Sequence, residues 1–227
     1  MTDALHVDEQ IVRSWTANAD AWTPVVREGL IPSRQTGTDA AIVAACVTLE
    51  SGPVLDVGCG EGWLVRALGE RGVVATGVDV GAPLIARATD GGGGNFLAAT
   101  YAQLAIDPTI ASGPWRGIVC NFALLGDPLY PILAALRARL ALRGRIVIQT
   151  VHPWTARGDA PYRSDWRTES FDGFGIVFPS PMPWFYRTLA SWHEQIALGG
   201  LRVVQLDEPL HATTGAPLSL VFHCEAM

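Results

Sequence analysis

The sequence has few cysteines, and none of them lie close together in the chain. Cys46, Cys59, Cys120 and Cys224 form no CxxC pair and no cluster with histidine at zinc-ligand spacing. Neither a disulfide framework nor a metal site is therefore expected. The first eight residues include Asp3 and Asp8, where the start of a secretory signal would be basic. These absences predict a cytoplasmic protein whose thiols stay reduced.

An excess of basic residues and a long uninterrupted apolar run are also missing. The 227 residues carry a formal net charge of −6, and a phosphate backbone would repel such a chain, so no nucleic-acid partner is expected. The most apolar stretch, residues 117–136, contains Asn121, Asp127, Pro128 and Pro131, which argues against a membrane span. A small-molecule or protein partner fits this composition better, and the oligomeric state stays open.

Short apolar segments alternate with helical patterns through the middle of the chain. The pattern predicts strands at 53–57, 73–80, 95–98, 116–122 and 145–151, with helices at 63–69, 82–89 and 129–142. Such alternation favours an α/β fold with a parallel sheet covered on both faces and every strand-to-helix loop at one edge. Outside this region we expect a helical stripe over 11–22 that Pro24 interrupts, helices at 39–49 and 187–198, and strands at 201–206 and 218–224.

The length favours one large domain, residues 1–227. Residues 153–186 break the strand–helix rhythm and hold nine of the 19 aromatic residues together with Pro179, Pro181 and Pro183. They are interpreted as a lid-like insertion over the ligand edge of the sheet. The predicted organisation is N-terminal capping helices at 1–50, a cofactor-binding core at 51–152, the insertion at 153–186, and a C-terminal helix and hairpin at 187–227.

A glycine-rich turn follows the first predicted strand. It contains Gly58, Gly60 and Gly62, and glycine lets the backbone turn tightly and a ligand lie against it. The helix that follows presents free N–H groups to ligand acceptors. Asp79, at the end of the next strand, can accept two hydrogen bonds from ribose hydroxyls. Together these features predict a nucleoside site at the carboxyl ends of the first two strands.

The spacing of the glycines distinguishes between nucleoside ligands. The turn reads G-x-G-x-G, whereas a dinucleotide turn reads G-x-G-x-x-G. Asp56, just before the turn, is unfavourable beside a diphosphate and suits a ligand with a positive ammonium group. An NAD(P)-dependent oxidoreductase is therefore the weaker alternative. The other alternative is a glycine turn that holds no ligand.

The ordered motifs resemble those of class I S-adenosylmethionine-dependent methyltransferases of the small-molecule type. They are Val54 to Trp63, Gly77-Val78-Asp79-Val80, residues 117–122 and Gly144 to Ile148. The resemblance implies a Rossmann-like seven-stranded sheet in which six strands are parallel and the last is antiparallel. It also implies transfer of a methyl group from S-adenosylmethionine to a small-molecule acceptor, with S-adenosylhomocysteine as product. A non-catalytic cofactor-binding or regulatory module on the same fold is the alternative.

Site residues are carried over from the family by position. The resemblance implies that Asp56, Gly58, Cys59 and Gly60 contact the methionine part, Asp79 holds the ribose, Val80 and Leu84 flank the adenine, and the Asn121 backbone meets the amino group. The family often has an acid near the adenine amine, where this chain has Thr100 and Tyr101. The hydroxyl of Thr100 or the backbone of Tyr101 would replace that acid.

Two further side chains are candidates for the site. Arg34, between the two N-terminal helices, would grip the methionine carboxylate bidentately or would be an ordinary surface arginine. His152 follows the fifth strand of the core and is the best candidate for a general base, which O-methylation of a hydroxyl would need. The alternative for His152 is a structural role, in which its side chain bonds to loop backbone. The aromatic residues of 153–186 predict either an apolar or aromatic acceptor or a small core of the insertion itself.

Overall fold

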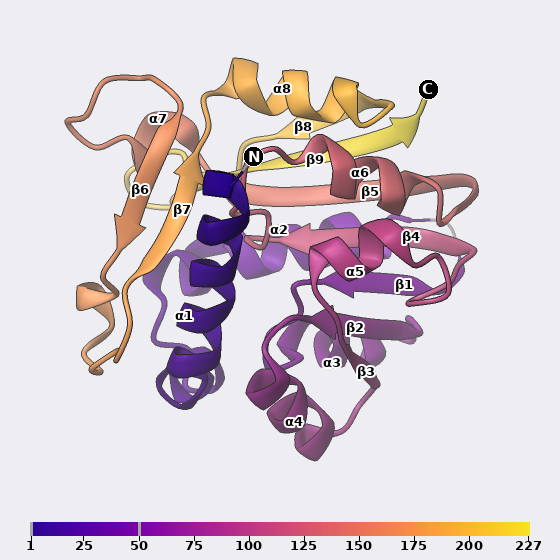
Figure 1. Ribbon diagram of the computed structural model, residues 1–227, viewed down its shortest axis with the longest axis horizontal. Helices are drawn as coiled ribbons and strands as arrows, with labels where there is room; N and C mark the ends of the chain where they lie inside the picture. Colours follow the sequence, from indigo (N-terminus) through magenta and orange to yellow (C-terminus); the bar gives the residue numbers. More distant parts are fainter. Residues whose placement is uncertain (1, 50) are drawn as a thin grey trace.

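The computed structural model describes residues 2–49 and 51–227, and its centre is a seven-stranded sheet (Figure 1). The strand order is β3-β2-β1-β4-β5-β9-β8. The strands are β1 (Val54–Val57), β2 (Ala75–Asp79), β3 (Asn95–Ala98), β4 (Trp115–Asn121), β5 (Leu140–Val151), β8 (Leu201–Asp207) and β9 (Ser219–Ala226). β9 runs antiparallel to both of its neighbours, and the pairs among β1 to β5 are parallel. This is the sheet that the resemblance implies, and the predicted fold class is confirmed.

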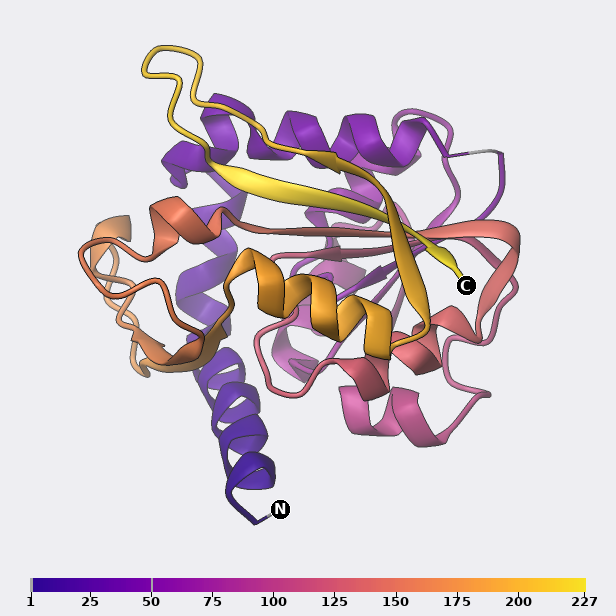
Figure 2. The same ribbon diagram turned by 90° about the horizontal axis from the view of Figure 1, so that it is seen from above.

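Helices cover both faces of the sheet (Figure 2). α2 (Asp39–Val47) and α3 (Trp63–Gly69) pack on one face, while α5 (Tyr101–Ile106), α6 (Tyr130–Arg137) and α8 (Leu189–Leu198) pack on the other. α4 (Ala82–Gly91) lies beside β2 and β3. Because strand side chains alternate, the central strands supply buried residues to both layers. No helix among the described residues has the length and apolar character to cross a membrane.

The first helix continues past the point where the sequence predicts an interruption. α1 (Thr2–Arg27) contains Pro24 within its last turn. Proline removes one backbone hydrogen bond from a helix, but the helical bonding resumes after it, since the N–H of Glu28 donates to the Pro24 carbonyl at 2.8 Å. Arg27, after the proline, binds Glu61 of the glycine turn at 2.8 Å. The predicted stop at Pro24 is wrong because tertiary contacts hold the final turn in place.

Two other predictions of secondary structure differ from the structure. The helix expected over 129–142 ends at Arg137, and β5 begins at Leu140, which pairs with Trp115 of β4. The sequence analysis also missed α5, although Thr100 and Gln103 form a capping box at its start, with backbone-to-side-chain bonds of 3.0 and 2.8 Å. The T-x-x-Q spacing was the available signal.

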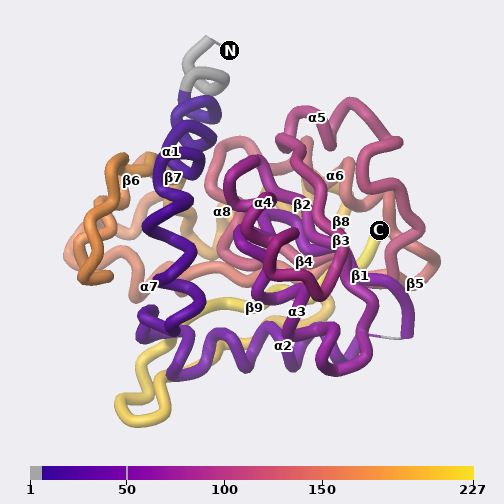
Figure 3. The backbone as a smooth tube through the Cα atoms, turned by 90° about the horizontal axis from the view of Figure 1, so that it is seen from below, coloured from indigo at the N-terminus to yellow at the C-terminus, as the bar shows by residue number. Residues whose placement is uncertain are grey.

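The insertion forms a small hairpin next to α1. β6 (Asp165–Glu169) pairs antiparallel with β7 (Met182–Tyr186), after the short helix α7 (Pro153–Ala156). Figure 3 shows α1 between this hairpin and the edge of the sheet. The amide of Asn18 joins α1 to the insertion, because its Nδ2 donates to the Ser180 carbonyl at 2.7 Å and its Oδ1 accepts from the Ser180 N–H at 3.1 Å. α1 and the insertion together therefore cover the edge at which the parallel strands end.

Candidate active site

A cavity of about 830 Å³ lies between the carboxyl ends of the strands, α1 and the hairpin. It brings together most of the residues predicted to bind a cofactor. These are Arg34, Gly58, Cys59, Gly60, Asp79, Val80, Leu84, Thr100, Tyr101 and Asn121. Asp56 is buried below the wall, with 1% of its surface exposed. His152 does not belong to the wall.

The glycine turn can adopt its path only without side chains at its tightest point. Gly58 has a φ of 80°, and a Cβ placed there would lie 2.3 Å from the Cβ of Ala123. Gly62 precedes α3 with a φ of 88°. Both backbone conformations are in the left-handed region that favours glycine. The turn therefore lies close against the segment after β4 and leaves its own backbone at the cavity.

Asp79 is connected to the glycine turn by a hydrogen bond. Its Oδ2 accepts from the Gly60 N–H at 2.9 Å, and its Oδ1 accepts from the Gly81 N–H at 2.7 Å. Burial raises the pKa of this carboxyl, while the bonds from Gly81 and Gly60 lower it. The carboxylate at the end of β2 is thereby held in one orientation at the cavity wall.

Asp56 lies beneath the turn in a setting that disfavours its charge. Burial, and secondarily the negative charge of Asp79, raise its pKa to about 8. Its Oδ1 is buried and has no hydrogen-bond partner among the described residues, and the same is true of Asn121 Oδ1 and Gln149 Oε1. Asn121 and Gln149 pair across β4 and β5 and both line the cavity. The oxygens of Asn121 and Gln149 are therefore acceptors without donors at the cavity wall, which suits a ligand bearing an ammonium group.

Arg34 is held at the cavity wall by two contacts. Its Nε lies 2.7 Å from Oδ1 of Asp39, and its guanidinium carbon lies 4.1 Å from the centre of the Trp63 ring. Only 12% of the Arg34 side chain is exposed. An ion pair and a cation–π contact therefore position this guanidinium at the cavity wall.

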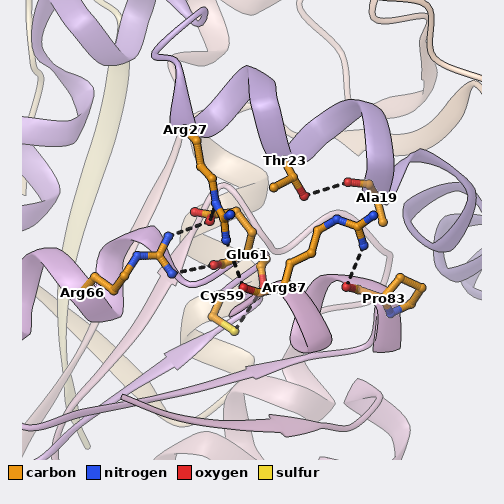
Figure 4. A network of polar contacts seen from close by, with 9 residues as sticks. Ala19, Thr23, Arg27, Cys59, Glu61, Arg66, Pro83 and Arg87 are labelled. Carbon is orange, nitrogen blue, oxygen red and sulfur yellow. Dashed lines mark hydrogen bonds and ion pairs between the residues drawn. The ribbon is translucent and has the colours of Figure 1, made fainter. Parts of the chain in front are cut away.

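Glu61, inside the glycine turn, is a structural centre that the sequence analysis missed (Figure 4). Its side chain is completely buried, and Oε2 accepts from Arg27 Nε at 2.8 Å and from Arg66 Nη2 at 2.6 Å. Arg27 also donates to the Arg87 carbonyl at 2.9 Å. The Glu61 carboxylate thus connects the end of α1 to the turn and α3, and Arg27 extends these contacts to α4. An acid within a glycine motif, followed by an arginine in the next helix, was the available signal.

Aromatic rings join α1 to the insertion above the glycine turn. The ring centre of Trp22 lies between 5.1 and 6.4 Å from those of Trp15, Phe171, Phe174 and Phe178. A Cβ at Gly60 would lie 3.9 Å from the indole nitrogen of Trp22. Trp22 therefore belongs both to the packing between α1 and the insertion and to the cavity wall.

The two interpretations of the insertion's aromatic residues apply to different rings. Cavity-lining rings are Phe171, Phe174, Trp184, Phe185 and Tyr186. Trp154 and Tyr162 instead pack together at 5.9 Å outside the cavity wall. The insertion thus supplies both a wall of the cavity and contacts of its own.

His152 and Thr100 are engaged in other contacts. The Nε2 of His152 lies 2.9 Å from Oε1 of Glu208, and the residue precedes α7 as its N-cap. The hydroxyl of Thr100 caps α5. Tyr101 lines the cavity, but its hydroxyl donates to the Ala123 carbonyl at 2.9 Å, and burial raises its pKa well above the usual range. The structure therefore does not bring His152 to a position from which a general base could act in the cavity.

Comparisons with known proteins agree with this geometry. The methyltransferase domain family matches residues 39–206, and the chain belongs to it. None of the curated proteins matches the chain.

Several solved structures share the fold at low identity. Magnesium protoporphyrin IX methyltransferase from Synechocystis, with bound S-adenosylhomocysteine, is 17% identical with a TM-score of 0.65, covering 97% of this chain and 100% of that chain. An S-adenosylmethionine-dependent methyltransferase from Mesorhizobium loti is 18% identical with a TM-score of 0.61, covering 81% and 95%. The CcbJ methyltransferase from Streptomyces caelestis is 18% identical with a TM-score of 0.61, covering 82% and 88%. The predicted assignment to the class I S-adenosylmethionine-dependent methyltransferases is confirmed.

Proposed function

We propose that the cavity binds S-adenosylmethionine over β1 and β2 and a small-molecule acceptor over β4 and β5. Asp79 would accept hydrogen bonds from the ribose hydroxyls, and Val80 and Leu84 would flank the adenine. The sheet order supports this division, because β1 lies between β2 and β4 and the cavity extends along all of these strand ends. Ligands of open α/β sheets bind in such a crevice outside the carboxyl ends of the strands.

The methionine part would lie along the glycine turn. Gly58, Cys59 and Gly60 offer backbone at the cavity wall, and Arg34 would bind the carboxylate with a guanidinium that Asp39 already orients. The ammonium group would donate toward the floor near Asp56 and Asn121, where buried oxygens have no donor in the described chain. Donor-free oxygens and a guanidinium at the same cavity would match the two charges of an amino acid.

Methyl transfer depends more on positioning the acceptor against the methyl group than on acid–base groups. S-Adenosylmethionine supplies a methyl group on a positively charged sulfur, so that the acceptor's lone pair forms the new bond to carbon while the electron pair of the C–S bond goes to sulfur. Orienting two reactants for such a displacement can contribute about 7–11 kcal/mol. α1 and the insertion would exclude water from this step, since their aromatic side chains line the cavity. His152 has no part in this proposal.

The observation that carries the proposal is the bond between Gly60 and Asp79, which places a glycine turn and a ribose-binding carboxylate at one cavity wall. Parallel calorimetric titrations with S-adenosylhomocysteine and NAD test it. Saturable binding of S-adenosylhomocysteine, with weaker or no binding of NAD, is expected. Tighter binding of NAD would contradict the proposal and favour an oxidoreductase.

A further inference from the structure

The cations in the cavity wall already have partners. The sequence contains no lysine, and among the described residues the wall contains three arginines, Arg13, Arg34 and Arg187. Each forms an ion pair. The partners are Glu9 at 3.0 Å, Asp39 at 2.7 Å and Asp127 at 2.8 Å. If Arg34 serves the cofactor carboxylate, Arg13 and Arg187 are the cations left for an acceptor.

Arg187 is the more enclosed of these two. Its side chain is completely buried, and Nη2 donates to the Gly126 carbonyl at 2.5 Å as well as to Asp127. The guanidinium carbon lies 4.7 Å from the Phe185 ring centre and 5.4 Å from that of Trp192. Its contacts explain a structural role that connects the end of β7 to the segment after β4. Arg13 is exposed and paired within α1.

Besides Asp79, two carboxylates in the same wall have no ion-pair partner in the described part of the chain. Asp8, on α1, lies close to the segment after β4, since a Cβ at Gly126 would be 2.9 Å from its Oδ1. Partial burial raises the pKa of the Asp8 carboxyl. Glu169, at the end of β6, accepts from the Phe171 N–H at 2.8 Å through Oε1 only. The acceptor half of the cavity therefore has an excess of negative charge.

Aromatic rings line the same cavity as these two carboxylates. Trp15 of α1 and Phe171, Trp184 and Phe185 of the insertion line the same cavity. The face of an aromatic ring attracts cations, and the attraction grows where water is excluded. Carboxylates act in the same direction, since opposite charges attract. A wall built from both groups selects for a positive charge on an apolar body.

We propose that the methyl acceptor is an aromatic or otherwise apolar compound carrying a protonated amine that is separate from the atom to be methylated, with its positive charge facing the wall that contains Asp8 and Glu169. This inference rests on the proposed function, because it concerns the acceptor end of the same cavity. The wall disfavours acceptors whose polar group is a carboxylate, since every charged side chain described in it that lacks an ion-pair partner is itself a carboxylate.

Three matched probes test the inference. We choose 1-naphthylmethylamine, 1-naphthylmethanol and the anion of 1-naphthaleneacetic acid. They share an aromatic body and are positively charged, neutral and negatively charged, respectively. Each is titrated by calorimetry into the protein saturated with S-adenosylhomocysteine, and separately into the protein alone. The amine is expected to bind about tenfold more tightly than the other two, which corresponds to about 1.4 kcal/mol. Added salt is expected to reduce this preference.

Matched variants test whether Asp8 and Glu169 cause the preference for the amine. Asp8→Asn and Glu169→Gln are each expected to lower the preference for the amine about threefold to tenfold, because each removes one charge and keeps the side chain's size. Asp90→Asn, on the exposed surface of α4 and outside the cavity wall, makes the same change in net charge and should leave the preference unchanged.

The remaining outcomes overturn the inference. These are equal binding of amine and alcohol, tighter binding of the carboxylate, binding of none of the three, or an amine preference that Asp8→Asn and Glu169→Gln leave intact. Failure of S-adenosylhomocysteine itself to bind would instead contradict the proposed function. The titrations without that ligand still measure the amine preference, so the two failures are distinguishable.

Discussion

The backbone N–H of Gly60 lies 2.9 Å from Oδ2 of Asp79 and donates a hydrogen bond to it. The other carboxylate oxygen accepts from Gly81 at 2.7 Å. Because Gly60 belongs to the turn after β1 and Asp79 ends β2, this carboxylate positions two neighbouring strand ends relative to each other. The same residue thus shapes the glycine turn and presents a ribose acceptor.

Replacing Asp79 should therefore weaken cofactor binding. For Asp79→Ala we expect the affinity for S-adenosylhomocysteine to fall by about 1–3 kcal/mol, since hydrogen bonds to a charged acceptor are lost. Calorimetry or a thermal-shift titration measures the change. Asp90→Asn serves as the control for altered charge. An unchanged affinity in Asp79→Ala would remove this residue from the ribose.

The role of Arg34 can be separated from that of the adenosine site by the choice of ligand. Arg34→Met should lower the affinity for S-adenosylhomocysteine roughly tenfold or more, because a charged hydrogen bond to the carboxylate is worth about 1.5–3 kcal/mol. 5′-Methylthioadenosine has no amino-acid part, so its affinity should stay the same. Equal losses for both ligands would mean that the substitution disturbs the cavity, and no loss for either would make Arg34 an ordinary surface residue.

Asp56 should make the unliganded protein less stable as the pH rises. Its pKa is about 8 in the folded protein and about 3.9 in an unfolded chain. Between these values the folded state binds the extra proton, so the free energy of unfolding falls with rising pH and levels off above about pH 8.

Urea unfolding of the wild type and Asp56→Asn measures this contribution. Between pH 6 and pH 8 the wild type should lose roughly 2 kcal/mol that the asparagine variant does not lose, because one bound proton corresponds to about 1.4 kcal/mol per pH unit. Parallel pH profiles of the two proteins would show that Asp56 ionises normally in the fold.

Glu61 should matter for stability through the contacts of its carboxylate. Glu61→Gln should lower the free energy of unfolding by about 1–3 kcal/mol, since Arg27 and Arg66 lose their charged partner inside the protein. Glu70→Gln is the matched control, because Glu70 is exposed and lies 4.0 Å from Arg71; its change should stay within about 0.5 kcal/mol. A Glu61 variant as stable as the control would show that the network contributes little.

The sequence predicted the features that depend on local pattern. The five parallel strands, the glycine turn and Asp79 were found because strand periodicity and glycine spacing are properties of neighbouring residues. Contacts between distant segments were not predicted. Examples are Glu61 with Arg27, and Asn18 with Ser180.

His152 is another residue whose contacts depend on a distant segment. The sequence placed it correctly after β5, but the direction of a side chain beyond a strand end depends on its tertiary partners. Here the carboxylate of Glu208, which follows β8, lies 2.9 Å from the Nε2 of His152. The helix past Pro24 has a similar cause, since Arg27 gains a buried partner far away in sequence. The division of the chain into four parts and the assignment of individual site residues stay predictions.

A crystal structure of the protein with S-adenosylhomocysteine would show directly whether the cavity is the cofactor site. We expect the ligand in the cavity, with its ribose hydroxyls within hydrogen-bond distance of Asp79 and its carboxylate at Arg34. A crystal grown or soaked at saturating ligand in which the cavity stays empty, or in which the ligand binds elsewhere on the protein, would contradict it.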